Sequence, residues 1–124
     1  MTTTAQALPV AIIGAGLAGL SCAQALVQAG HQVHVFDKSR GPSGRMSTRR
    51  AEDPAGPWQC DHGAQYFTAR DAAFRAEVAR WQQAGVAAVW DARLASFDGN
   101  AWTTSQTPLE RFVGTPRMTS PAAW

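Results

Sequence analysis

The chain has 124 residues, of which 45% are hydrophobic and only 16% are charged. A disordered chain would show the opposite balance, so these proportions favour one folded domain or part of a larger one. The formal net charge is +2, with 11 basic and 9 acidic residues, a smaller positive excess than nucleic-acid-binding domains usually carry. We therefore expect a small-molecule partner and no nucleic-acid partner.

Cysteine usage and hydropathy bear on the cellular location. Cys22 and Cys60 provide neither a disulfide framework nor the spacing of a zinc site. Cys22 falls in an apolar helical pattern, so we expect it to be a small core residue. The apolar stretch at residues 8–20 is too short to span a bilayer and lacks the flanks of a signal peptide. These features predict a cytoplasmic location, no membrane association and no metal site.

The first predicted elements are a strand, a helix and a second strand. Val10–Ile13 is a short apolar run, as expected for a strand buried on both faces. A helical pattern follows over residues 17–29 and ends at Gly30. Its predicted apolar face comprises Ala18, Cys22, Ala25, Leu26 and Ala29. Residues 32–36 form the second predicted strand, so the fold class is α/β with a Rossmann-type βαβ unit.

The rest of the chain is predicted to contain one more helix and short strands. Residues 39–58 are rich in Gly and Pro, which predicts a long loop. Residues 68–71 fit a capping box that opens a helix ending at Gly85, and Asp71 is expected to pair with Arg75 one turn later.

Within this second helix, Phe74, Val78 and Trp81 share one face. Short strands are predicted over residues 86–90, 93–97 and 101–104. The last two are joined by the hairpin turn signal Asp98-Gly99-Asn100, whereas the tail from Thr115 shows no clear period.

A glycine motif lies between the first strand and the first helix. Residues 14–19, GAGLAG, match G-x-G-x-x-G in the strand–turn–helix context that dinucleotide-binding sites require. Gly14 permits the tight turn, Gly16 lets a pyrophosphate approach the backbone, and Gly19 lets the helix pack closely on the strand. The helix N-terminus offers free N–H groups to the phosphates.

Asp37 ends the second strand, eighteen residues after Gly19. Its carboxylate is placed to accept hydrogen bonds from an adenosine ribose, and its charge disfavours the 2′-phosphate of NADP. The glycine motif and Asp37 alone leave FAD and NAD open as cofactors.

Residues 37–49, DKSRGPSGRMSTR, resemble the segment that follows the second strand in flavin-containing amine oxidases, and most closely in the renalase-like group. Residues 61–68, DHGAQYFT, and residues 111–114, RFVG, are similar to later segments of that family. The resemblance implies the N-terminal, FAD-binding part of a two-domain oxidoreductase. Such an enzyme transfers a hydride from a reduced substrate, either a dihydronicotinamide or an amine, to FAD, with oxygen as the final acceptor.

The resemblance also implies which residues approach the cofactor. The Gly44–Met46 segment would pass along the pyrophosphate and flavin, and residues 63–65 would approach the flavin ring. The complete predicted cofactor set is Gly14, Ala15, Gly16, Leu17, Ala18, Gly19, Asp37, Lys38, Gly44, Arg45, Met46, Gly63, Ala64 and Gln65. No catalytic side chain is assigned, and His62 is expected to be structural. Ser43 replaces the first glycine of the family's Gly-Gly-Arg trio, which strains the backbone if that position needs a positive φ.

We divide the chain, residues 1–124, into a βαβ core (8–38), a flavin-approaching loop (39–67), a helix with short strands (68–114) and an irregular tail (115–124). The strands that complete the sheet in this family are expected to be missing. The chain would then be a partial domain with weak FAD binding and sheet edges open to self-association. Two alternatives are a fragment of an NAD-dependent dehydrogenase and a truncated, non-catalytic nucleotide-binding module.

Overall fold

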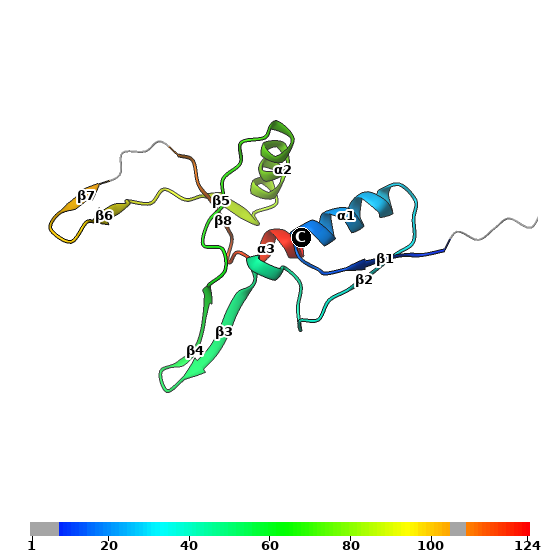
Figure 1. Ribbon diagram of the computed structural model, residues 1–124, viewed down its shortest axis with the longest axis horizontal. Helices are drawn as coiled ribbons and strands as arrows, with labels where there is room; N and C mark the ends of the chain where they lie inside the picture. The colour runs from blue at the N-terminus through cyan, green and yellow to red at the C-terminus, as the bar shows by residue number, and fades with distance from the viewer. Residues whose placement is uncertain (1–7, 105–108) are drawn as a thin grey trace, which may run out of the picture.

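The computed structural model describes residues 8–104 and 109–124. Strands β1 (Val10–Ile13) and β2 (Val33–Phe36) pair in parallel, with Val10 opposite Val33 and Ile13 opposite Phe36. Helix α1 (Leu17–Gln28) connects them and lies along the pair (Figure 1). The predicted Rossmann-type βαβ unit is therefore confirmed. The expected burial of the first strand on both faces is wrong, because alternate residues of β1 are exposed.

The orientation of α1 about its axis differs from the prediction. Cys22 and Ala25 are exposed, so the expected core role of Cys22 is wrong. The partly buried positions of the helix are Leu17, Gly19, Leu20, Ala23 and Leu26. A Cβ on Gly19 would lie 1.9 Å from the carbonyl oxygen of Gly14 and 3.4 Å from the side chain of Ile12. Because only glycine permits this approach, Gly19 decides which face of α1 meets β1.

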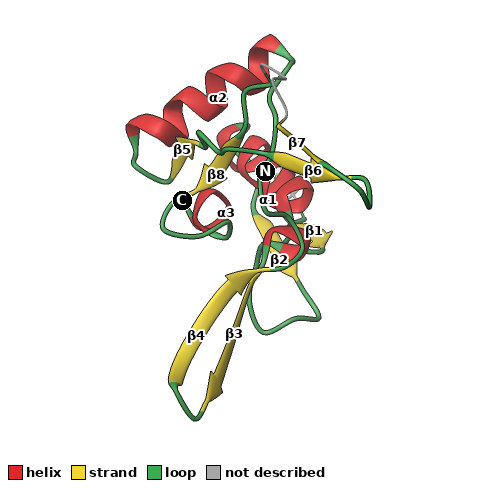
Figure 2. Cartoon of the chain, turned by 90° about the vertical axis from the view of Figure 1, so that its left-hand side faces the viewer, coloured by secondary structure: helices red, strands yellow, loops and turns green. Residues whose placement is uncertain are grey.

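An antiparallel hairpin occupies much of the segment that was predicted to be a loop. A 3-10 turn, η1 (Gly44–Met46), leads into β3 (Thr48–Asp53), which pairs with β4 (Gly56–Asp61). The Asp53 carboxylate accepts a 2.8 Å hydrogen bond from the Ala55 backbone N–H, and Gly56 has φ +120°, so the chain reverses tightly there. The strands are mostly exposed and carry charged residues, which removes the apolar alternation that usually indicates strands. The hairpin projects away from the helices (Figure 2).

Helix α2 (Ala72–Gln83) packs on β5 (Ala87–Val89), which pairs antiparallel with β8 (Phe112–Gly114). The N-cap of α2 is Asp71, whose carboxylate accepts a 2.9 Å bond from the Phe74 N–H, so the predicted capping box at Thr68 is wrong. The expected Asp71–Arg75 pair is also wrong. The Asp71 carboxylate is engaged at the N-cap, and the Arg75 guanidinium instead forms a 2.9 Å ion pair with Glu110.

The main hydrophobic core lies around α2 rather than in the βαβ unit. Its buried members are Ala69, Val78, Trp81, Ala87 and Phe112, with Leu17, Phe67, Phe74 and Val86 packed against them. The shared face of α2 is thus confirmed for Phe74, Val78 and Trp81. Most tryptophans lie elsewhere and are exposed.

The remaining elements are a second hairpin and a short terminal helix. Strands β6 (Ala95–Phe97) and β7 (Trp102–Thr104) pair antiparallel across the predicted turn. There the Asp98 carboxylate accepts hydrogen bonds from the Asn100 and Ala101 N–H groups, and Gly99 has φ +103°. The predicted irregular tail instead contains α3 (Ser120–Ala123), anchored by Met118, which is 0% exposed. Within the described ranges, no helix is long and apolar enough to cross a membrane.

Candidate functional site

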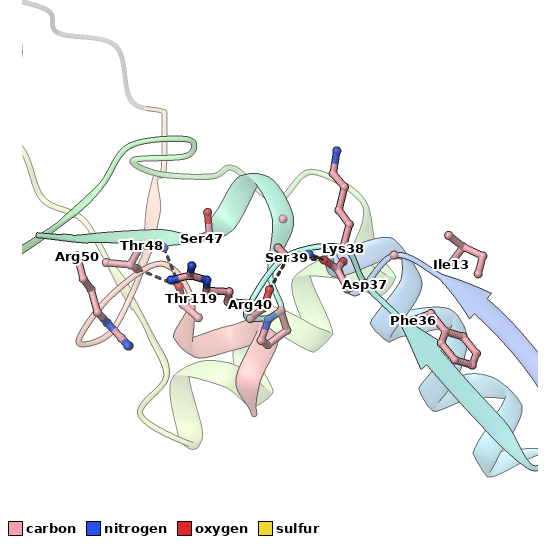
Figure 3. Close-up of a pocket in the computed structure, with 14 residues that line it drawn as sticks. Ile13, Phe36, Asp37, Lys38, Ser39, Arg40, Ser47, Thr48, Arg50 and Thr119 are labelled. Carbon is pink, nitrogen blue, oxygen red and sulfur yellow. Dashed lines mark hydrogen bonds between the residues drawn. The ribbon is translucent and has the colours of Figure 1, made fainter.

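A groove of about 960 Å³ opens at the carboxyl ends of β1 and β2, where parallel α/β sheets usually bind ligands (Figure 3). Its lining residues are Ile13, Gly14, Phe36, Asp37, Lys38, Ser39, Arg40, Gly41, Pro42, Gly44, Ser47, Thr48, Arg50 and Thr119. Ile13 and Phe36 are 84% and 56% exposed and supply apolar surface beside Asp37. The groove therefore extends from the end of β2, past the glycine turn, to the start of β3.

The Asp37 carboxylate holds the turn that carries the glycine motif. One of its oxygens accepts a 2.6 Å hydrogen bond from the Ala15 N–H, and the other accepts bonds from the hydroxyl and backbone N–H of Ser39. These bonds, that of the Ser39 hydroxyl first, lower the pKa of Asp37 to about 2. Asp37 is therefore a carboxylate at any physiological pH, as a hydrogen-bond acceptor for a ribose must be.

The loop after Asp37 returns to the glycine turn and forms the next part of the groove. The Ser43 N–H donates a 2.7 Å bond to the Ala15 carbonyl, and Ser43 forms a parallel bridge with Gly16. A Cβ on Gly44 would lie 3.4 Å from the Gly16 Cα, an ordinary van der Waals distance, so the two segments are in contact.

The backbone strain expected where Ser43 replaces the first glycine of the Gly-Gly-Arg trio is confirmed. The φ of Ser43 is +98°, in the left-handed region that favours glycine, and only 1% of the residue is exposed. Its hydroxyl is buried without a hydrogen-bond partner, which adds a desolvation cost.

The structure brings only part of the predicted set to the groove. Gly14, Asp37, Lys38 and Gly44 line it. Ala15 and Gly16 are not among the lining residues but contact Asp37 and Ser43, respectively. Residues 17–19 form the first turn of α1. Arg45 and Met46 lie in η1 and do not line the groove.

Residues 63–65 follow β4 and lie outside the groove lining. A Cβ on Gly63 would lie 2.3 Å from the carbonyl oxygen of Arg45. Gly63 therefore packs behind η1, and its contact is with the backbone of the Gly44–Met46 segment.

Sequence reasoning missed several lining residues, including Ser39, Arg40, Ser47, Thr48, Arg50 and Thr119. Ser39 carried a usable signal, because a serine two residues after an aspartate can close a local turn with its carboxylate. Thr119 carried none, since it reaches the groove only through tertiary packing.

The arrangement fits a dinucleotide. Gly16 has φ −75°, and a Cβ built on it would meet no heavy atom within 4 Å, so the space beside its backbone is open for a ligand. Gly16 is the N-cap of α1 and has no side chain, so no side-chain cap occupies the N–H groups of the first turn. These groups and the positive side chains of Lys38, Arg40 and Arg50 suit a diphosphate. Among the described residues, no group of three potential metal ligands occurs.

Comparison with known proteins agrees with the Rossmann-type fold. The family model described as "NAD(P)-binding Rossmann-like domain" matches residues 12–80. The L-amino-acid oxidase of Sistrurus catenatus edwardsii is 47% identical over 53 residues, which are 43% of this chain and 10% of that protein. The L-amino acid oxidase of Bothrops pictus is 46% identical over 52 residues, covering 42% of this chain and 10% of that protein.

Among solved structures, putrescine oxidase bound to putrescine superimposes with a TM-score of 0.52 at 23% sequence identity. The superposition covers 80% of this chain and 21% of putrescine oxidase, and at this identity it shows a shared fold. The chain spans about a tenth of the length of the curated relatives it matches.

Proposed function

Since the chain belongs to the family of NAD(P)-binding Rossmann-like domains, we propose that its groove binds the adenosine diphosphate part of FAD. The observation that carries the proposal is the hydrogen bond between Ala15 and Asp37. It places the glycine turn, which suits a pyrophosphate, directly beside a carboxylate that suits a ribose.

Each end of an adenosine diphosphate would meet a matching part of the groove. The ribose hydroxyls would donate to the Asp37 carboxylate, which keeps a free lone pair on the oxygen that Ala15 contacts. The diphosphate would lie over Gly14 and Gly16, at the N-terminus of α1 and within the positive field of Lys38 and Arg40. The Asp37 charge would repel a 2′-phosphate, so the site would select against NADP.

The proposed role in a complete protein is nucleotide binding in an oxidase that acts on amines or amino acids. The similarity of the chain to L-amino-acid oxidases and to putrescine oxidase supports this role. The resemblance of residues 37–49 and 61–68 to renalase-like proteins extends the substrate class to dihydronicotinamides. Bound FAD would supply the hydride acceptor, with oxygen as its oxidant, and this chain would supply the binding and orientation.

Titration calorimetry of the chain with ADP, 2′,5′-ADP, FAD and NAD tests the proposal. We expect ADP and FAD to bind and 2′,5′-ADP to bind at least about tenfold more weakly, since a second charge would face the Asp37 carboxylate. Preference for FAD over NAD in these titrations would support the flavin assignment. Absence of ADP binding, or equal affinity for ADP and 2′,5′-ADP, would contradict the proposal.

A further inference from the structure

Thr119 joins the end of the chain to the segment that leads into β3. Its side-chain oxygen accepts a 3.0 Å hydrogen bond from the Thr48 backbone N–H. The same hydroxyl lies 2.9 Å from the Thr48 hydroxyl and 3.3 Å from the Met46 carbonyl oxygen. Thr119 and Thr48 both line the groove, at the end away from Asp37 (Figure 3).

Asp61, in β4, completes this network by accepting hydrogen bonds from Thr48 and Met118. One carboxylate oxygen accepts a 2.6 Å bond from the Thr48 hydroxyl, and the other accepts a 3.1 Å bond from the Met118 N–H. The Thr48 proton is therefore committed to Asp61, which leaves the Thr119 hydroxyl to donate to Thr48 or to Met46. Every polar group in the network has a partner, so its geometry is well determined.

Close backbone packing holds the same region from two sides. A Cβ on Gly114 would lie 2.3 Å from the Arg117 carbonyl oxygen and 2.7 Å from the Met118 Cα. Gly63 approaches the Arg45 carbonyl in the same way. The turn before α3 is thus fixed against β8, and the turn η1 against the segment after β4, so Thr119 has little freedom to move away from Thr48.

The position of the network in the groove suggests its role. Asp37 is placed to receive the ribose and the glycine turn to receive the diphosphate. A ligand portion that continues along the groove beyond the diphosphate would therefore reach Ser47, Thr48 and Thr119. We propose that Thr119 is a positioning residue that holds the Ser47–Thr48 wall in place to receive the part of FAD beyond its ADP half. This inference rests on the proposed FAD binding and adds a residue that neither the sequence motifs nor the family match identifies.

The test compares Thr119→Val, which keeps the shape but removes the hydroxyl, with Thr119→Ser, which keeps the hydroxyl. Titration calorimetry measures the Kd of ADP and of FAD for each chain, and circular dichroism monitors folding. We expect Thr119→Val to raise the FAD Kd about tenfold, the effect of losing about one hydrogen bond, while the ADP Kd stays within about twofold. Thr119→Ser should bind FAD within about threefold of the unmodified chain.

Asp61→Asn is a second variant, useful if Thr119→Val does not fold. Asp61 does not line the groove, so it can affect FAD binding only through its hydrogen bonds with Thr48 and Met118. Asp61→Asn should raise the FAD Kd about threefold and leave the ADP Kd unchanged.

The outcomes separate the inference from the proposed function. If the unmodified chain binds ADP and FAD, and both Thr119→Val and Asp61→Asn bind FAD as the unmodified chain does, the positioning role is overturned. Equal weakening of ADP and FAD also overturns it, since that indicates a general structural role. If the unmodified chain binds no ADP at all, the proposed function fails, and the inference fails with it.

Discussion

The Ala15 N–H, in the turn after β1, donates a 2.6 Å hydrogen bond to the Asp37 carboxylate at the end of β2. This contact joins two residues that lie 22 positions apart and that both belong to the predicted cofactor-binding set. Asp37 therefore has two roles, because the carboxylate that would receive the ribose also fixes the turn that would receive the diphosphate. Variants at this position must be designed so that the two roles can be separated.

Asp37→Asn removes the charge and keeps an amide oxygen that can accept from Ala15, while its NH2 group replaces the oxygen that accepts from Ser39. We expect ADP binding to weaken by about 1–3 kcal/mol, the range for hydrogen bonds to a charged group, and discrimination against 2′,5′-ADP to shrink. Ser39→Ala is the matched control, because it removes one bond to Asp37 but keeps the carboxylate. Calorimetry measures both, and an unchanged ADP affinity in Asp37→Asn would remove Asp37 from the binding site.

The low pKa of Asp37 predicts a pH dependence of stability. A carboxyl whose pKa is about 2 in the folded chain, against an ordinary 3.8, stabilises the fold above pH 3.8 and loses this contribution as the pH falls toward 2. Urea unfolding at pH values between about 5 and 2 should therefore show a steeper loss for the unmodified chain than for Asp37→Asn. Parallel curves for the two chains would contradict the shift.

The Ser39 hydroxyl is the largest cause of that shift. In Ser39→Ala, the pKa of Asp37, followed by the NMR signal of its carboxyl carbon, should rise toward its ordinary value. An unaltered titration would show that the backbone N–H groups of Ala15 and Ser39 account for the shift.

Two glycines of the same motif should respond differently to alanine. Gly16→Ala places a Cβ in open space, so the chain should fold with a loss of no more than about 1 kcal/mol, the cost of alanine in place of glycine at an N-cap. Its ADP binding should nevertheless be strongly reduced, because the methyl group occupies the ligand's approach. Calorimetry that detects unchanged ADP affinity in Gly16→Ala would place the ligand away from this turn.

Gly19→Ala is the structural counterpart, since its Cβ would lie 1.9 Å from the Gly14 carbonyl oxygen. We expect a loss of at least about 1–3 kcal/mol in the free energy of unfolding, as overpacked sites usually show. Thermal and urea unfolding measure it. A stability equal to that of the unmodified chain would mean that α1 can shift away from β1 at little cost.

Replacing Ser43 by glycine should stabilise the chain. The change removes a positive φ in a residue with a side chain and also removes a buried hydroxyl that has no partner. We expect a gain of about 1 kcal/mol in the free energy of unfolding, after the greater flexibility of glycine in the unfolded chain is subtracted.

Ser43→Ala separates the two causes, because alanine keeps the backbone strain and loses the hydroxyl. A gain in Ser43→Ala equal to that in Ser43→Gly would assign the whole effect to the buried hydroxyl. A loss of stability in Ser43→Gly would show that the strain at φ +98° is not released by glycine.

Local patterns in the sequence determined the βαβ unit, the glycine turn and Asp37. Their signals lie in adjacent residues: an apolar run, three glycines at fixed spacing and an acid at the end of the next strand. The shared face of Phe74, Val78 and Trp81 was equally predictable, because it follows from helical spacing alone.

Only the tertiary structure decided which face of α1 is buried, since Ala18, Cys22 and Ala25 have the same helical spacing as the residues that pack. Close approach of Gly19 to Gly14 selects between the faces, and this approach leaves no periodic signal. The β3–β4 hairpin was hidden because exposed, charged strands lack apolar alternation.

The far wall of the groove is the clearest case of structure deciding what sequence could not. Thr119 and Thr48 lie 71 residues apart, and the polar network that joins them depends on hydrogen-bond geometry rather than on residue type or period. Hydrophobic spacing reports which surface an element buries, whereas a contact between two hydroxyl groups exists only once packing has brought their backbones together.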